Sequence, residues 1–286
     1  MLQEQRNQDQ ASQLRNMKPN KPIRVIAVTA GKGGVGKTNV SVNLAIALAN
    51  LKHKVMLFDT DLGLANVDVL LGLHPKSNIK NVVNGECSLR DVIVDGPSGI
   101  KIIPASSGTQ MLTDLSVREH AGLISAFSEL SNDIDTLIID TPAGVSDTVT
   151  TYVQAANEVI IVVCDEPPSI TDAYALIKIM NKTHNVNHFH VLANMVQSPA
   201  EGRSLFSKLQ RTSDRFLDVQ LDYMGEIPFD KSLRQAVKKQ TAVIEAFPGS
   251  TAAKAFVTQA KKIISWPVNG ELSNGLQFFM ERLSRS

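Results

Sequence analysis

Seven short runs of mostly apolar residues, separated by helical patterns and polar turns, limit the folds that this chain can adopt. The runs are RVIAVTA, KVMLFDT, GIKIIPA, DTLIIDT, EVIIVVC, HFHVLAN and LDYMGEI. Most of them are continuously apolar rather than alternating, which is typical of parallel strands that are buried on both faces. Helical patterns such as SVNLAIALANL, TDAYALIKIM and EGRSLFSKL lie between them. The sequence therefore predicts a doubly wound α/β fold, with a mostly parallel sheet and helices on both of its faces.

The two ends of the chain differ from this body. Residues 1–21 are rich in Gln and Asn and lack apolar periodicity, so we expect a flexible leader before a domain at 22–265. Residues 266–286 are expected to form a linker and a terminal amphipathic helix. The formal net charge of +1 gives no global reason to expect direct nucleic-acid binding. No run of eighteen apolar residues is present, and two cysteines make no disulfide framework, which favours a reduced, cytoplasmic chain.

The stretch AGKGGVGKT, residues 30–38, lies between the first apolar run and a helical pattern. It matches G-x-x-x-x-G-K-[ST], in which glycines let backbone N–H groups and a helix dipole face phosphate oxygens. In this pattern Lys37 reaches the β- and γ-phosphates, and the Thr38 hydroxyl binds Mg²⁺. We therefore predict a nucleotide and Mg²⁺ site formed by Gly31, Lys32, Gly33, Gly34, Val35, Gly36, Lys37, Thr38 and Asn39.

Carboxylates follow two of the apolar runs, as phosphoryl transfer requires. Asp140 ends a strand pattern at the position where a metal-holding carboxylate is expected. Asp59 and Asp61 end the second run, and their spacing of two places both side chains on one side of a continuing strand. One of this pair can hold a metal-bound water while the other orients the attacking water. The alternative for all three is a solvated turn at the end of a strand.

The second lysine of the loop, Lys32, has no role in the general phosphate-binding pattern. The motif K-G-G-x-G-K-T with this extra lysine resembles the deviant Walker A motif of the MinD/ParA class of P-loop ATPases. The resemblance covers roughly residues 22–265 and includes FDTDLGLANVD, IIDTPAG, VLANMV and GEIPFD. It implies a slow ATPase that forms a homodimer around ATP, in which Lys32 reaches the phosphates of the partner.

The same resemblance implies roles for the other polar residues. Asp61 would position the attacking water, next to Lys32 and Lys37 as the catalytic lysines. Thr38, Asp59 and Asp140 would serve the Mg²⁺ shell. Asn194, at VLANMV, and Pro228, at GEIPFD, would border the adenine. For Asn194 the alternative is a residue that merely ends a strand.

Near the N-terminus, DQASQLR at residues 9–15 resembles the D-Q-A-x-x-L-R motif of the FlhG family, MinD-like regulators of flagellar number. In that family the segment binds and activates FlhF, a signal-recognition-type GTPase. The resemblance implies that Gln10 is offered to the GTPase active site, while Asp9, Leu14 and Arg15 support docking. It also implies contacts with a flagellar C-ring protein and with an enhancer-binding transcription factor of flagellar genes. From composition alone the segment would be a disordered leader.

The C-terminal stretch ELSNGLQFFMERLSRS has the spacing of an amphipathic helix. One face carries Leu272, Leu276, Phe279, Met280 and Leu283. We predict that it binds the membrane surface, so that the ATP-bound dimer is peripheral on the inner face of the cell membrane. The alternative is a helix docked on the body of the protein.

Two other functions share the phosphate-binding loop. A positioning ATPase for cell division or DNA partition is one, and DNA partition calls for a strongly basic surface. An iron–sulfur carrier is the other, and it needs paired cysteines, whereas Cys87 and Cys164 lie far apart in the sequence. His184, His188 and His190 have no fixed metal-ligand spacing, so we expect ordinary surface or core histidines.

Overall fold

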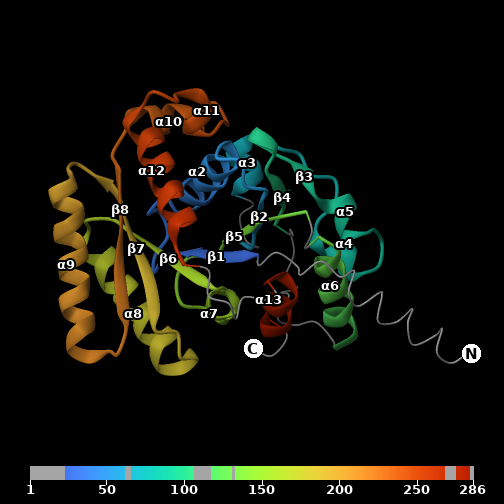
Figure 1. Ribbon diagram of the computed structural model, residues 1–286, viewed down its shortest axis with the longest axis horizontal. Helices are drawn as coiled ribbons and strands as arrows, with labels where there is room; N and C mark the ends of the chain where they lie inside the picture. The colour runs from blue at the N-terminus through green and yellow to red at the C-terminus, as the bar shows by residue number, and fades with distance from the viewer. Residues whose placement is uncertain (1–22, 62–65, 106–116, 131–132, 268–274, 284–286) are drawn as a thin grey trace, which may run out of the picture.

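The computed structural model describes residues 23–61, 66–105, 117–130, 133–267 and 275–283 (Figure 1). They form an eight-stranded sheet of order β3-β4-β2-β5-β1-β6-β7-β8. The strands are β1 (Arg24–Thr29), β2 (Val55–Asp59), β3 (Val94–Asp95), β4 (Lys101–Ile103), β5 (Thr136–Asp140), β6 (Glu158–Val163), β7 (His188–Val196) and β8 (Gln220–Pro228). Neighbouring strands pair in parallel except β3 with β4, which are antiparallel. The predicted fold class and all seven predicted strands are confirmed.

Helices cover both faces of the sheet (Figure 1). Side chains on one face pack with α2 (Lys37–Asn50), α3 (Val67–Leu71), α10 (Lys231–Lys238), α11 (Val243–Ala246) and α12 (Thr251–Ser265). Those on the other pack with α4 (Ile79–Val83), α5 (Leu89–Val92), α6 (Val117–Glu129), α7 (Asp147–Ala155), α8 (Pro167–His184), α9 (Pro199–Phe216) and α13 (Gly275–Leu283). A short 3₁₀ turn, η1 (Pro97–Gly99), joins β3 to β4.

The continuous apolar runs are explained by these two cores. Along β1, Val25 and Ala27 face one core, whereas Ile26 and Val28 face the other. All four side chains are fully buried. A strand that is buried on both faces needs apolar residues at every position, so no alternation is visible in the sequence. The two-residue β3 escaped prediction because an edge strand of this length carries no pattern of its own.

The parallel arrangement brings the loops after β1, β2, β5, β6 and β7 to one edge of the sheet, formed by the carboxyl ends of these strands. The phosphate-binding loop follows β1, and α2 begins at Lys37 directly after it. Asp59 and Asp140 are the last residues of β2 and β5, and they are register partners on these adjacent strands. The fold therefore places the predicted loop and two of the predicted carboxylates together.

The C-terminal helix is docked on the body, which differs from the surface helix that the sequence favoured. α13 packs against α6, α7 and β1. Leu276, Phe279, Met280 and Leu283 are each at most 3% exposed. Their apolar face is covered by α6, α7 and β1 of the same chain, and we call this docking place the α13 groove. The segment before it is also held: Trp266 stacks on His190, and its carbonyl accepts a hydrogen bond of 2.9 Å from Arg24.

Some predicted residues lie outside the described ranges. These are Asp9, Gln10, Leu14 and Arg15 of the leader and Leu272 of the tail. Among the described residues, none of the helices combines the length and apolar character that crossing a bilayer requires.

Candidate nucleotide-binding site

The two glycines that frame the phosphate-binding loop are required by close contacts. A Cβ atom on Gly31 would lie 2.2 Å from the backbone of Asp172 in α8. Gly36 has a φ of +84°, and a Cβ atom there would lie 2.5 Å from the Asn194 side chain. Any larger residue at either position would clash, and at Gly36 it would also be strained. The loop is thus held between α8 and the end of β7.

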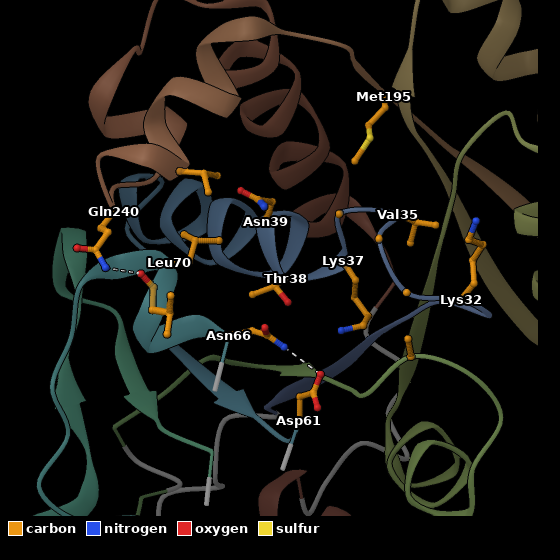
Figure 2. A pocket seen from close by; sticks show the side chains of 16 residues that line it. Lys32, Val35, Lys37, Thr38, Asn39, Asp61, Asn66, Leu70, Met195 and Gln240 are labelled. Carbon is orange, nitrogen blue, oxygen red and sulfur yellow. Dashed lines mark hydrogen bonds between the residues drawn. The ribbon is translucent and has the colours of Figure 1, made fainter. Parts of the chain in front are cut away.

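An open pocket of about 600 Å³ lies in front of the loop, within the range of ligand sites (Figure 2). All loop residues from Lys32 to Asn39 line it. The start of α2 points its free backbone N–H groups toward this space, which favours an anion such as a phosphate group. Of the predicted loop residues, Gly31 alone does not line the pocket, because it packs on α8.

Asp140 gathers the polar side chains behind the loop. Its carboxylate accepts hydrogen bonds from Thr38 Oγ1 at 2.7 Å and Ser41 Oγ at 2.8 Å. The Lys37 ammonium lies 3.2 Å from Asp140 Oδ1, and both side chains are buried. Ser41, one helical turn after Lys37, was not predicted, because it lies outside the loop pattern. Lys37 is thus neutralised by the carboxylate that was predicted to serve Mg²⁺.

Asp59 lies beside Asp140 in an environment that disfavours its charge. Burial, together with the negative charge of Asp140, raises the pKa of Asp59 to about 7. Backbone N–H groups of Asp61, Asn66 and Val67 donate to its carboxylate. Two buried carboxylates and the Thr38 hydroxyl are oxygen ligands of the kind that Mg²⁺ prefers. These residues therefore fit a magnesium ion, whose charge would relieve the repulsion between the carboxylates.

Asp61 lies at the edge of the pocket. Its Oδ2 accepts a hydrogen bond of 2.9 Å from Asn66 Nδ2, and both residues line the pocket (Figure 2). The Asn66 amide thereby fixes the direction of the carboxylate. Asn66 was not singled out from the sequence, although it lies in the FDTDLGLANVD stretch.

Lys32 lines the opposite rim of the pocket (Figure 2). Its Nζ forms an ion pair of 2.9 Å with Glu166 Oε2, and the Lys32 side chain is 31% exposed. The hydrogen bond to Glu166 raises the pKa of Lys32, so the lysine stays charged. The side chain is therefore restrained by a contact within its own chain, yet solvent reaches it from the pocket side.

Neither of the two predicted adenine residues, Asn194 and Pro228, lines the pocket. Asn194 is 4% exposed, and its Nδ2 donates to the Val35 carbonyl at 2.8 Å. This contact supports the loop backbone. Pro228 ends β8 and is the register partner of Val196. Contact of Asn194 and Pro228 with a base stays a prediction.

Several pocket residues were missed by the sequence analysis. Met195, which follows Asn194 in β7, lines the pocket and has a φ of 60°. Val237 lies near the end of α10 and Gln240 in the turn after it, and Gln240 donates to the Val69 carbonyl at 3.0 Å. This bond joins the turn after α10 to α3 at one side of the pocket (Figure 2). No local pattern marks such residues, since only the tertiary fold brings α3 and α10 to the loop.

Cys164 lies behind the loop, with its sulfur 3.6 Å from the Val35 carbonyl. Burial and the nearby Glu166 carboxylate raise the pKa of its thiol to about 11. A thiolate, which metal binding requires, is therefore disfavoured here. Cys164 is therefore poorly placed to be a ligand of an iron–sulfur cluster held at a protein surface.

Comparison with known proteins gives consistent matches. A family model described as ParA, NUBPL iron-transfer P-loop NTPase, matches residues 22–264. The antiactivator FleN of Pseudomonas aeruginosa is 60% identical over 262 residues, which are 92% of this chain and 94% of that protein. The flagellum site-determining protein YlxH of Helicobacter pylori is 34% identical, covering 91% of this chain and 89% of YlxH. The MinC:MinD cell division protein complex of Aquifex aeolicus has a TM-score of 0.68 at 27% identity, covering 86% of this chain and 97% of that one.

Proposed function

This chain belongs to the MinD/ParA family of P-loop ATPases, among its FlhG-like flagellar regulators, and we propose that it is a switch that dimerises around ATP to set flagellar number and placement. The observation that carries the proposal is a second loop lysine, Lys32, at the rim of the nucleotide pocket. A lysine there is not needed to bind nucleotide in one chain, because Lys37 already serves the loop.

In this proposal Lys37 would pair with the phosphates of ATP instead of with Asp140. Thr38, Asp140 and the neighbouring Asp59 would hold Mg²⁺ and its bound waters. The ion supplies positive charge that stabilises the negative charge developing on the transferred phosphoryl group. Lys37 would thus have a negatively charged partner in either arrangement, Asp140 or the phosphates.

Hydrolysis needs a water aimed at the terminal phosphate, and Asp61 is the residue that we assign to it. Its carboxylate lies at the pocket edge, and Asn66 holds its direction.

Lys32 is the residue that would join two chains. Its ion pair with Glu166 is solvent-exposed, and exposed ion pairs contribute little to stability. Negative phosphates of a nucleotide in the partner chain would compete effectively for the ammonium. Exchange of Glu166 for these phosphates would link dimerisation to the presence of ATP.

The membrane part of the proposal requires α13 to leave its groove. The same apolar face, Leu276, Phe279, Met280 and Leu283, would then enter the lipid surface. One short helix binds a membrane weakly, but two helices in one dimer bind together with a high effective concentration. The ATP-bound dimer would thus be peripheral on the inner face of the cell membrane, and the monomer would be cytoplasmic.

The partner contacts of the proposal follow the FlhG likeness. The leader, with Asp9, Gln10, Leu14 and Arg15, would bind an FlhF-type GTPase and stimulate it. A flagellar C-ring protein and an enhancer-binding transcription factor are the further partners.

Light scattering with and without ATP tests the dimer. Lys32→Ala should bind ATP as a monomer nearly as well as the unchanged chain, yet form no ATP-dependent dimer. Lys76→Ala, at an exposed lysine outside the pocket, is the control and should dimerise normally. A full ATP-dependent dimer of Lys32→Ala would refute the role in trans.

A GTPase assay tests the leader. Gln10→Ala should leave the ATPase activity of this chain unchanged and lower the stimulation of an FlhF-type GTPase. Gln3→Ala, at a glutamine outside the 9–15 motif, is the matched control. If stimulation survives deletion of residues 1–20, the leader is not the activating segment.

A further inference from the structure

Four polar side chains meet at the amino-terminal ends of β6, β7 and β8, on the opposite side of the sheet's strands from the nucleotide pocket. We call Glu158, His188, His190 and Asp222 the histidine cluster. Glu158 is the first residue of β6, His188 and His190 begin β7, and Asp222 lies near the start of β8. In the register of these parallel strands, His190 is opposite both Ile160 and Asp222. Residues two apart share a face, so the four side chains project from one face of three adjacent strands.

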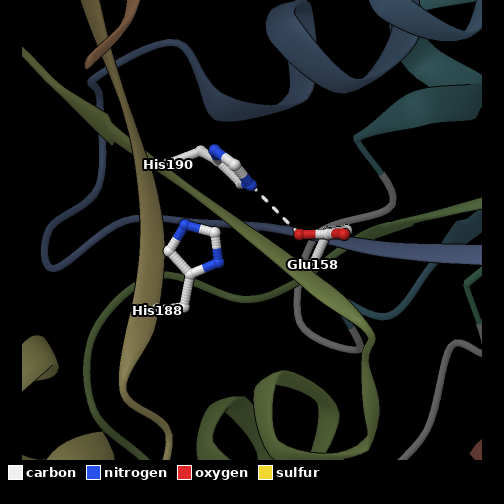
Figure 3. Close-up of side chains that lie close together, drawn as sticks. All are labelled: Glu158, His188 and His190. Carbon is white, nitrogen blue, oxygen red and sulfur yellow. Dashed lines mark hydrogen bonds and ion pairs between the residues drawn. The ribbon is translucent and has the colours of Figure 1, made fainter. Parts of the chain in front are cut away.

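We propose that this cluster binds a divalent transition-metal ion of the zinc type, with Glu158, His188 and His190 as ligands. One ligand atom of each of these residues lies within 4.8 Å of the others. Two imidazoles and a carboxylate are a common protein ligand set for zinc, with an open fourth position for water. Figure 3 shows the two rings and the carboxylate side by side. This proposal does not rest on the ATP-dependent switch.

The spacing needs only a small adjustment to close around an ion. Ligands about 2.1 Å from a tetrahedral zinc lie about 3.4 Å apart. His190 Nε2 is already 3.0 Å from Glu158 Oε2. The His188 side chain is 44% exposed and hydrogen-bonded to Asp222, so a small rotation about that contact would supply the remaining approach of up to about 1.4 Å. Its exposure also gives an ion from solvent a path to the site.

Two residues hold the rings in place. Trp266 stacks on His190 with centroids 3.8 Å apart and planes 8° from parallel, which fixes the ring of this buried histidine. Asp222 Oδ2 lies 2.7 Å from His188 Nε2 and 3.9 Å from His190 Nδ1. A carboxylate that binds the second nitrogen of a ligand histidine sets its tautomer and direction. Asp222 is therefore a positioning residue in the proposal.

The charge balance favours a cation. With neutral imidazoles the cluster carries two carboxylates, and the neighbouring cation that interacts with Glu158 is Arg24. The guanidinium of Arg24 is directed to the carbonyl groups of Ile263 and Trp266. A divalent ion would neutralise the negative charge that remains. The alternative is an ordinary network of hydrogen bonds and ion pairs that holds no metal ion.

Metal binding to the full-length, untagged and chelator-treated chain distinguishes these two cases. Equilibrium dialysis with Zn²⁺, in the absence of nucleotide, should give one ion per chain. Trp266 is the one tryptophan of the sequence and reports on the cluster directly. Co²⁺ should therefore quench its fluorescence in a saturable way, and Zn²⁺ should reverse the quenching.

Variants identify the ligands. His188→Ala alters an exposed side chain and should weaken Zn²⁺ binding at least about tenfold, as should Glu158→Gln. His74→Ala, at an exposed histidine outside the cluster, should bind like the unchanged chain. Thermal melting without metal checks that the variants are folded. If Glu158→Gln does not fold, the result for His188→Ala alone decides the test. Absence of saturable binding, or equal binding by His188→Ala, would overturn the proposal.

Discussion

Phe279→Ala tests whether α13 is a releasable element or a permanent part of the body. Phe279 is 1% exposed. Truncation of a phenylalanine in a core that cannot rearrange costs about 3–5 kcal/mol of the free energy of unfolding. Phe256 in α12 is the matched control, because it is 0% exposed and its helix packs between α2 and β8. Phe256→Ala should therefore have the full cost.

For Phe279→Ala the cost is limited by the free energy of docking. Burial of Leu276, Phe279, Met280 and Leu283 contributes about 6–12 kcal/mol. Ordering the nine residues of α13 costs about 9–18 kcal/mol of backbone entropy. The two ranges overlap, so docking is a small net effect. If α13 leaves without unfolding the sheet, as proposed, Phe279→Ala should lower the free energy of unfolding by less than half as much as Phe256→Ala.

Urea unfolding followed by far-ultraviolet circular dichroism measures both costs, and hydrogen exchange locates the loss. In Phe279→Ala, exchange should rise in α13 and the segment before it while β1, β5 and β6 stay protected. Binding of the ATP-bound variant to anionic vesicles should also weaken, because the Phe279 ring would no longer be available to enter the lipid surface. Equal costs for the two variants would show that α13 unfolds only with the body, and the membrane proposal would then fail.

Three further predictions concern the nucleotide site. Asp61→Ala should retain Mg·ATP and its dimer but lose phosphate release, so undiminished release would exclude Asp61 as the water-positioning residue. Glu166→Gln removes the exposed ion pair of Lys32. The protein concentration that ATP-dependent dimerisation requires should therefore fall, by no more than about fivefold. Light scattering that shows weaker dimerisation would contradict this. The pKa of Asp59 is raised to about 7 in the folded chain, whereas the ordinary pKa of an aspartate, as in the unfolded chain, is 3.8. The free energy of unfolding without nucleotide should therefore fall as the pH rises from about 4 to about 7, by at most about 1.4 kcal/mol per unit, and urea titrations should show this slope lost in Asp59→Asn.

The sequence predicted those parts of the molecule that depend on local pattern. Gly31, Gly36 and Lys37 mark the loop because backbone geometry and phosphate chemistry restrict the residues at fixed spacing. The seven strands were visible because burial on both faces requires apolar residues throughout. The comparisons confirmed the FlhG resemblance, which rested on the loop lysine and the 9–15 motif.

Contacts between distant segments were beyond the sequence analysis. Gln240 reaches the pocket from the turn after α10, and nothing in the neighbouring sequence indicates this. The amphipathic pattern of α13 shows an apolar face but not what covers that face. Docking on the body and binding to a membrane would both require the same apolar residues. The two histidines of β7 looked ordinary because Glu158 and Asp222, which complete the histidine cluster, lie 30 or more residues away in the chain.

The anchoring of Trp266 has a consequence for how the protein would sit on a bilayer. Trp266 is fixed by Arg24 and His190 at the amino-terminal edge of the sheet. The chain from there to Gly275 spans at most about 30 Å even when fully extended. A released α13 therefore works on a short tether. The lipid would meet the edge of the sheet that carries the start of β1, and the phosphate-binding loop would point toward the cell interior, open to its partner.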